Sequence, residues 1–290
     1  MSKTKAAVLL IAVFAARGTS FLFSKTLMRT LDPLSILAVR FTLAFLLLAL
    51  VFCKRLRAWG RNSLRGGVIL GVLYTVCMVF EMFGLRLIDS GVSSLIENMA
   101  IVLVPLYAAV LTHTPPRRKT MLCALLSVLG VAFLSLTQGQ NVGGGAGILL
   151  AVLAALTYGV CILATEKVSR DADPITVGIV QLGTMGALSL ALSLFTGGCA
   201  LPRTGSEWLM LMSLVLVCSC FGFAFQPLGQ KYLPAEAAAV FTVINPLTAS
   251  VLGIAVAGES VSPAKFAGYA LIITALLLYN MHGRKRISAK

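Results

Sequence analysis

Ten stretches of apolar sequence follow one another along the chain, with only short polar breaks between them. A helix that crosses a bilayer needs about 20 predominantly apolar residues, because the hydrocarbon core is about 30 Å thick. Each stretch is therefore predicted to cross a membrane as a helix. The predicted segments are residues 5–30, 34–53, 65–87, 91–112, 119–136, 146–166, 174–196, 206–231, 236–257 and 263–281.

The composition argues against a water-soluble fold. Hydrophobic residues make up 58% of the chain and charged residues 12%, whereas an ordinary soluble domain carries about 25% charged residues. We therefore predict an all-α membrane protein with ten transmembrane helices. The basic start with Lys3 and Lys5 resembles a secretion signal, but Arg17 is followed by further apolar sequence, so the first segment is predicted to be a retained helix.

The net charge of +14 does not indicate nucleic-acid binding, because the basic residues stand in short breaks and no soluble domain presents them as a face. With the N-terminus in the cytoplasm, 17 of the 24 lysines and arginines fall on the inner side. This bias fits the positive-inside rule and predicts an inner (plasma) membrane protein with both termini cytoplasmic. The inner set is Lys3, Lys5, Lys54, Arg55, Arg57, Arg61, Arg65, Arg117, Arg118, Lys119, Lys167, Arg170, Lys231, Arg284, Lys285, Arg286 and Lys290.

No metal or cofactor site is predicted. Most of the seven cysteines lie inside apolar segments, and Cys218 and Cys220 are two residues apart, so they point in different directions on a helix. The two histidines, His113 and His282, stand at segment ends. The chain has no phosphate-binding loop of the G-x-x-x-x-G-K type, which argues against direct use of ATP.

The chain repeats itself at an offset of about half its length. Residues 23–33 resemble residues 164–174, and both stretches end in Asp-Pro, 141 positions apart. Pro105-Leu106 and Pro246-Leu247 share this offset, and Glu81-x-x-Gly84-x-Arg86 matches Gln226-x-x-Gly229-x-Lys231 at an offset of 145. Five helices is an odd number, so the second copy enters the membrane from the opposite side. We predict two inverted five-helix repeats, residues 1–140 and 141–290, an arrangement typical of secondary transporters, with plain duplication for stability as the alternative.

Several motifs resemble the drug/metabolite transporter superfamily, in particular its EamA-type permeases. The resemblance covers nearly the whole chain, and the order and spacing of the motifs carry it. The motifs are Arg17-Gly18-Thr19-Ser20-Phe21-Leu22-Phe23-Ser24-Lys25, Asp32-Pro33, Ala38-Val39-Arg40-Phe41, Phe83-Gly84-Leu85-Arg86, Val104-Pro105-Leu106, Gln230-Lys231-Tyr232-Leu233-Pro234-Ala235-Glu236-Ala237-Ala238, Asn245-Pro246-Leu247 and Gly258-Glu259-Ser260.

The resemblance implies ten helices in two EamA repeats, and metabolite transport without ATP. It implies no particular substrate. The chain departs from the family pattern at Arg17, where an aromatic residue is usual, and at Glu81 and Glu97, in helices that are mostly apolar in such permeases.

Four ionisable residues fall within the predicted membrane interior: Arg17, Arg40, Glu81 and Glu97. Such groups cost about 2.5–3.5 kcal/mol or more at the bilayer centre, so they persist when paired or when they line water. At about 1.5 Å per residue, the last three each lie about 9 Å from the outer end of a different helix. We predict that this layer lines the substrate path. Arg40 would hold an anionic group, such as a carboxylate, or hold a glutamate ready, and Glu81 or Glu97 would take up and release a proton. A static ion-pair network is the alternative.

Other polar residues are candidate substrate or coupling residues: Asn98, Gln181, Gln226, Asn245 and, at the outer end of the first helix, Lys25. Gln226 holds the repeat position of Glu81, and Gln181 that of Arg40, so a site between the repeats would be charged on one side and neutral on the other. Ordinary interhelical hydrogen bonds are the alternative for each amide. Pro105 and Pro246 are predicted to kink the fourth and ninth helices.

The predicted function is secondary active transport of a small metabolite, an amino acid or a similar compound, by alternating access. We expect export, with protons as a candidate coupling ion. The predicted partners are the metabolite and the bilayer, and the oligomeric state is not predicted. The alternatives are a membrane-embedded enzyme acting on a lipid phosphate with Arg40, Glu81 and Glu97 as its site, and a subunit that transports nothing. An enzyme is not expected, since both histidines are misplaced for it.

Overall fold

The computed structural model describes residues 1–56, 60–111, 144–242 and 244–256, with isolated positions between 113 and 133 and between 262 and 278. All regular structure in this part is helical. The predicted segments 119–136 and 263–281 lie largely outside the described residues. Within the described part, seven helical stretches are long and apolar enough to cross a membrane.

The first half contributes six described helices. They are α1 (Lys3–Leu27), α2 (Pro33–Val51), the short α3 (Cys53–Leu56), α4 (Arg61–Leu87), α5 (Ser90–Glu97) and α6 (Ala100–Leu111). The second half contributes α8 (Gly144–Arg170), α9 (Pro174–Phe195), α10 (Gly205–Ser213), the π-helix η1 (Leu214–Phe223), α11 (Ala224–Gln230), α12 (Ala235–Phe241) and α13 (Ile244–Ala255).

Two Asp-Pro pairs start equivalent helices in the two halves. Asp32 caps α2 by accepting a hydrogen bond from the N–H of Leu34 at 3.0 Å, and Asp173 caps α9 by accepting one from the N–H of Thr176 at 3.0 Å. The proline that follows each aspartate occupies the first helical position, where a missing N–H has no cost. The repeated sequence therefore encodes the same local structure twice.

The fourth and ninth predicted segments are each divided into two helices. α5 ends at Glu97 and α6 begins at Ala100, while α12 ends at Phe241 and α13 begins at Ile244. Pro246 is the third residue of α13, where the lack of a backbone N–H leaves no helical hydrogen bond unmade, whereas Pro105 lies inside α6. The breaks lie about one or two helical turns before the prolines. At the first break the N–H of Met99 donates to the carbonyl oxygen of Ile96 at 3.0 Å, three residues back instead of four.

The eighth predicted segment is also irregular. Residues 214–223 form the π-helix η1 between α10 and α11, which the sequence pattern did not predict. In a π-helix the hydrogen bonds run five residues back and the helix is wider, and such turns are frequent at functional sites. η1 carries Ser219 and Phe223, and both belong to the site described below.

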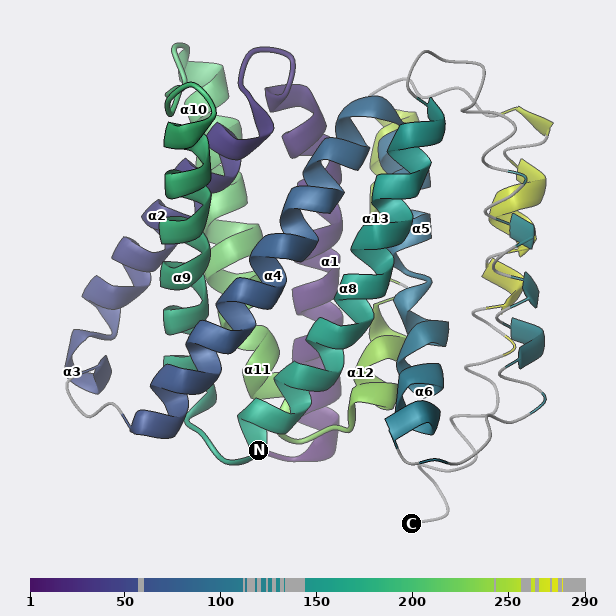
Figure 1. The fold of residues 1–290 in the computed structure, drawn as a ribbon, viewed down its shortest axis with the longest axis horizontal. Helices are drawn as coiled ribbons and strands as arrows, with labels where there is room; N and C mark the ends of the chain where they lie inside the picture. Colours follow the sequence, from purple (N-terminus) through teal and green to yellow (C-terminus); the bar gives the residue numbers. More distant parts are fainter. Residues whose placement is uncertain are drawn as a thin grey trace.

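The long helices stand side by side, and equivalent helices run in opposite directions. In Figure 1, α1 leads away from the end where the N-terminus is marked, and α8 leads back towards it. Extensive contacts join α2 to α9 and α4 to α8. Large apolar side chains such as Leu50, Leu149, Phe195 and Leu209 are exposed on the outside, as expected where lipid is the solvent.

A close contact between two helices occurs at one glycine in each half of the chain, and the equivalent residues are separated by the offset of the sequence repeat. A Cβ atom placed on Gly18 would lie 2.7 Å from Thr248, and one on Gly159 would lie 2.8 Å from Tyr107. Gly159 stands 141 positions after Gly18, and Thr248 stands 141 positions after Tyr107. The approach of α1 to α13 is therefore repeated by the approach of α8 to α6.

A second close contact between helices also occurs at one glycine in each half of the chain. Gly84 of α4 packs against Ala151 of α8, and Gly229 of α11 packs against Leu10 of α1. Gly84 and Gly229 are 145 positions apart, and Leu10 and Ala151 are 141 apart. The slightly different offsets match the small length difference between the two copies.

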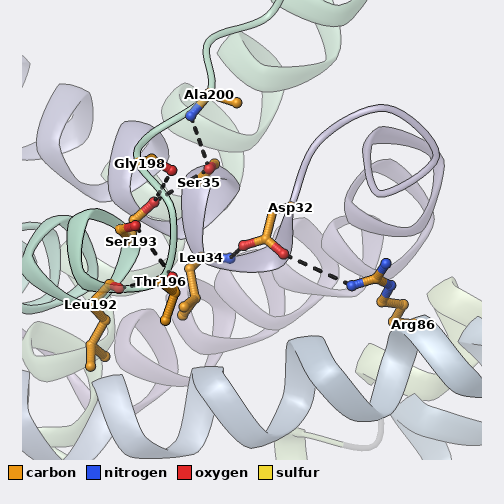
Figure 2. A network of polar contacts seen from close by, with 9 residues as sticks. All are labelled: Asp32, Leu34, Ser35, Arg86, Leu192, Ser193, Thr196, Gly198 and Ala200. Carbon is orange, nitrogen blue, oxygen red and sulfur yellow. Dashed lines mark hydrogen bonds and ion pairs between the residues drawn. The ribbon is translucent and has the colours of Figure 1, made fainter.

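Figure 2 shows the polar contacts at the end of the bundle where α2 begins, which we call the Asp32 end. Asp32 forms an ion pair with Arg86 of α4 at 3.8 Å. The hydroxyl groups of Ser35 and Ser193 lie 3.3 Å apart, and Ser35 accepts a hydrogen bond from the N–H of Ala200 at 3.0 Å. These contacts join α2 to α4, to α9 and to the loop after α9.

Candidate functional site

Arg17 lies buried in the middle of α1 and is held by groups from the second half. Its Nη1 donates to the carboxamide oxygen of Gln226 at 2.7 Å and to the phenol oxygen of Tyr158 at 3.0 Å. Its guanidinium carbon lies 4.3 Å from the ring centre of Phe223 and 5.0 Å from that of Tyr158, within cation–π range. Among the described residues, no ion pair within 4 Å fixes this arginine.

Arg40 of α2 is also buried, and hydroxyl groups hold it. Its Nε donates to Ser219 of η1 at 2.7 Å, and its Nη1 donates to Ser20 of α1 at 2.9 Å. Its guanidinium carbon lies 5.9 Å from the ring centre of Phe223, on which Arg17 also stacks. The Nη2 groups of both arginines have no protein acceptor within the described part of the chain, so they remain available to a ligand.

A small cavity lies between the two arginines. The space open to the centre of a water molecule is about 10 Å³, so in this conformation the cavity has room for about one water. A substrate would require the surrounding helices to separate. The lining residues are Arg17, Ser20, Phe21, Arg40, Met78, Glu81, Phe223 and Asn245.

Glu81 of α4 and Glu97 of α5 form a pair of buried carboxyl groups beside this cavity. They lie within hydrogen-bonding reach of each other, and Glu81 lies within electrostatic range of both arginines. No donor among the described residues reaches either oxygen of Glu97. Two carboxyl groups in contact repel when both are ionised and form a hydrogen bond when one holds a proton. The pair is therefore suited to holding one proton between its members.

A hydrogen-bonded chain of neutral groups continues from Arg17 into the second half. Gln226 donates to the hydroxyl oxygen of Tyr74 at 2.9 Å and to the side chain of Gln230 at 3.1 Å. Gln230 in turn donates to the carbonyl oxygen of Ile162 at 3.3 Å. Because the partners of each group are fixed, this chain sets the position of Arg17.

The predicted site residues are partly brought together. Arg17, Arg40, Glu81 and Asn245 line one cavity, Glu97 contacts Glu81, and Gln226 bonds to Arg17. The amide oxygen of Asn245 has no hydrogen-bond partner among the described residues. All the charged groups come from the first half, whereas the second half supplies amides, hydroxyl groups and aromatic rings.

Three other predicted residues do not line this cavity. Gln181 is buried on α9, and Asn98 donates to the carbonyl oxygen of Ser94, one turn earlier, at 2.9 Å. Lys25 lies at the Asp32 end, where it donates to the carbonyl oxygen of Ile88 at 2.5 Å and pairs with Asp89 at 3.7 Å. Lys25 thus ties α1 to the start of α5, away from the cavity.

Four uncharged residues of the site were not predicted from the sequence. Tyr74, Tyr158, Ser219 and Phe223 each contact one of the arginines or a direct partner of Arg17. One signal could have found Tyr158, because it stands 141 positions after Arg17 and so holds the repeat position of an ionisable residue. Metal binding finds no support within the described part of the chain, where no group of three or more His, Cys, Asp or Glu side chains could hold an ion.

The comparison with known proteins gives one family. The family described as the EamA-like transporter family matches residues 4–136 and again residues 145–281. A protein of Archaeoglobus fulgidus named as an uncharacterized transporter is 27% identical over 248 residues, which cover 85% of this chain and 86% of that protein. A second transporter so named from the same organism is 24% identical over 269 residues, covering 91% of this chain and 82% of that protein.

Two further similarities extend this comparison. The uncharacterized transporter YcxC of Bacillus subtilis is 29% identical over 161 residues, covering 53% of this chain and 51% of that protein. A solved crystal structure superimposes with a TM-score of 0.70 at 19% sequence identity, covering 98% of this chain and 99% of the other. At that identity the structural likeness speaks for the fold alone.

Proposed function

Since the chain belongs to the EamA-like transporter family and is a multi-pass membrane transporter, we propose that it moves a small metabolite by alternating access through the cavity between Arg17 and Arg40. The observation that carries this proposal is the position of the cavity. Charged groups from the first half and neutral groups from the second half meet at this cavity. The helices of the two halves also make the same close glycine contacts.

The proposed architecture has ten transmembrane helices in two inverted five-helix repeats, residues 1–140 and 141–290. The repeated glycine contacts and the opposite directions of α1 and α8 support it. The lysine and arginine bias favours an inner membrane location with both termini in the cytoplasm. The Asp32 end then faces outward, and the end that carries Asp173 faces inward.

The two ends differ in a way that suits alternating access. At the outer end Asp32 pairs with Arg86. Their equivalents in the repeat are Asp173 and Lys231, which line a hollow of about 400 Å³ at the inner end. There Lys231 donates to the carbonyl oxygen of Ala172 at 3.2 Å. We propose that the two equivalent pairs close the two ends in turn, and that this conformation is closed outside.

The proposed substrate carries an anionic group, such as the carboxylate of an amino acid. A guanidinium group binds a carboxylate through parallel N–H donors, and two guanidinium groups face this cavity. Export remains part of the proposal as the expected physiological direction. The membrane-embedded enzyme is disfavoured, because the described residues around the cavity include no histidine and Ser20 is occupied by Arg40.

Transport by reconstituted vesicles tests the proposal. Amino acids, small carboxylates, sugars and small amines are offered as labelled solutes, with and without a pH gradient. We expect saturable movement of at least one anionic or zwitterionic solute, and its loss in Arg40→Ala. If no solute moves while the purified protein turns over a phospholipid in detergent, the enzyme is the correct function.

A further inference from the structure

The four ionisable side chains of the central site are all at least 95% buried, so their charges must balance within the protein. The exposed fractions are 5% for Arg17, 1% for Arg40, 4% for Glu81 and 1% for Glu97. The two arginines are always charged and contribute two positive charges. The two glutamates contribute one negative charge when the pair holds a proton and two when it does not.

The other titratable groups around these four leave this balance unchanged. They are Tyr74 and Cys77 of α4, Tyr158 and Cys161 of α8, and Cys218 of η1. Phenols and thiols are ordinarily neutral near pH 7. The facing residues from α12–α13 and α11, Asn245 and Gln226, carry amides.

If the pair holds at most one proton and the site is either empty or holds an anion, only two states of the site are free of net charge. In the first, no ligand is present and both glutamates are ionised, so two negative charges balance two arginines. In the second, the pair holds one proton and the missing negative charge is supplied by a ligand that carries a single negative charge. A proton without the anion, or the anion without a proton, leaves an uncompensated charge in an interior of low dielectric constant, which is unfavourable.

We propose that the site takes up one small monoanion together with one proton on the Glu81–Glu97 pair, and that the two cross the membrane as an electroneutral unit. This inference rests on the proposed function and names its substrate class and stoichiometry. The anion is held by the free Nη2 groups of Arg17 and Arg40, with the amide of Asn245 beside them. The proton binds to an oxygen of one carboxyl group and is shared with the other.

The arrangement of the arginines favours a single anionic group over a larger charge. Each guanidinium already gives hydrogen bonds to neutral acceptors and faces the ring of Phe223, so neither is neutralised by direct contact with a carboxylate. A dianion with one proton would leave a net negative charge, and a cation would add to the positive one. Because binding linkage is reciprocal, the anion must strengthen proton binding as much as the proton strengthens anion binding.

Vesicles that contain the purified protein test the stoichiometry directly. The probes are glycolate, lactate, gluconate and isethionate as monoanions, succinate as a dianion, alanine as a zwitterion and choline as a cation. Internal pH is followed with a trapped dye, and potassium with valinomycin sets the membrane potential. We expect one proton to enter with each monoanion, no response to the potential, and about tenfold accumulation for a gradient of one pH unit.

The variant Glu97→Gln separates coupling from binding. The site then keeps a fixed charge of +1, which an anion balances without a proton. Exchange of labelled for unlabelled monoanion should continue, whereas accumulation driven by a pH gradient should be lost. Glu207→Gln is the matched control, because it makes the same change in an exposed capping box that glutamine can also form.

The wild-type protein alone can overturn the inference, whatever the stability of the variant. Movement of a monoanion that changes with membrane potential contradicts it, as does movement without protons. If alanine or choline moves and no monoanion does, the substrate class is wrong while the proposed transport function stands. If no monoanion of the panel binds or moves, the inference also fails.

Discussion

Arg17 donates a hydrogen bond of 3.0 Å to the phenol oxygen of Tyr158, and these two residues hold the same position in the two halves, 141 residues apart. Equivalent residues of two related halves can touch only close to the axis that relates them. Gln226, the equivalent of Glu81, also accepts a hydrogen bond from Arg17. The cavity therefore lies beside this axis, and the two halves present different chemistry to it.

The first prediction concerns this bond. Replacing Tyr158 by Phe removes the acceptor, while Gln226 continues to hold Arg17. A hydrogen bond to a charged group contributes about 1.5–3 kcal/mol. We expect Tyr158→Phe to lower stability in detergent by that order and to weaken substrate affinity about tenfold.

Tyr107→Phe is the control for this variant. The hydroxyl group of Tyr107 donates to the carbonyl oxygen of Leu156 at 3.1 Å, outside the site. Thermal unfolding and the KM of transport are measured for both proteins. Equal effects of the two substitutions would mean that the Arg17–Tyr158 bond has no special role.

The second prediction tests the close approach of α1 to α13. A Cβ atom on Gly18 would lie 2.7 Å from the Cβ of Thr248 and 2.8 Å from the backbone oxygen of Asn245. Because these atoms cannot move without shifting α13, Gly18→Ala should destabilise the protein by about 1–3 kcal/mol. Gly145→Ala, where nothing lies within 4 Å, should leave the unfolding temperature unchanged or slightly raised. Similar losses in both would contradict the packing described here.

The third prediction separates charge from geometry at Arg40. Lysine keeps the positive charge but lacks the planar guanidinium group, through which Arg40 donates to Ser219 and Ser20 at once. Each lost hydrogen bond to the charged group costs about 1.5–3 kcal/mol, so Arg40→Lys should reduce transport at least about tenfold. Arg29→Lys, at an exposed position between α1 and α2, should transport normally. Full activity in Arg40→Lys would show that charge alone is required.

The sequence predicted much of the fold because apolar length and polar breaks determine where a membrane helix begins and ends. Asp32-Pro33 and Asp173-Pro174 start helices as expected. The break after Glu97 and the π-helix η1 were not predicted, since neither stretch contains a proline or glycine pair that would mark an interruption of the helix. Apolar periodicity indicates where a helix can span a membrane, but not where its backbone hydrogen-bond pattern changes.

In the candidate site, the rare ionisable residues identified the side chains that come from the first half of the chain. They did not identify those that come from the second half. Arg17, Arg40 and Glu81 stand out because a charge is unusual in an apolar segment. Tyr158 and Phe223 are ordinary residues in such a segment, and only the fold brings them to the arginines. Gln181 was predicted from its repeat position, but α9 does not carry it to the cavity lining.

The fourth prediction tests whether Asp32 and Arg86 hold the outer end closed. Asp32→Asn removes the ion pair and keeps the helix cap, because asparagine is also a good N-cap residue. An exposed ion pair contributes up to about 1 kcal/mol, so the population open to the outside should rise up to about fivefold. The measurement is the labelling rate of Met78→Cys, in the cavity lining, by an impermeant thiol reagent added outside.

A substitution at the inner end should change the rate of outside labelling in the opposite direction. Lys231→Met removes the cation that we expect to pair with Asp173 when the inner end closes. The protein should then favour the conformation described here, and outside labelling of the same cysteine should fall. Asp171→Asn, an exposed neighbour of Asp173 without a described partner in α11, serves as the control with no expected change. If Asp32→Asn and Lys231→Met shift labelling in the same direction, the two pairs do not alternate, because reciprocal gates must respond oppositely to the loss of either one.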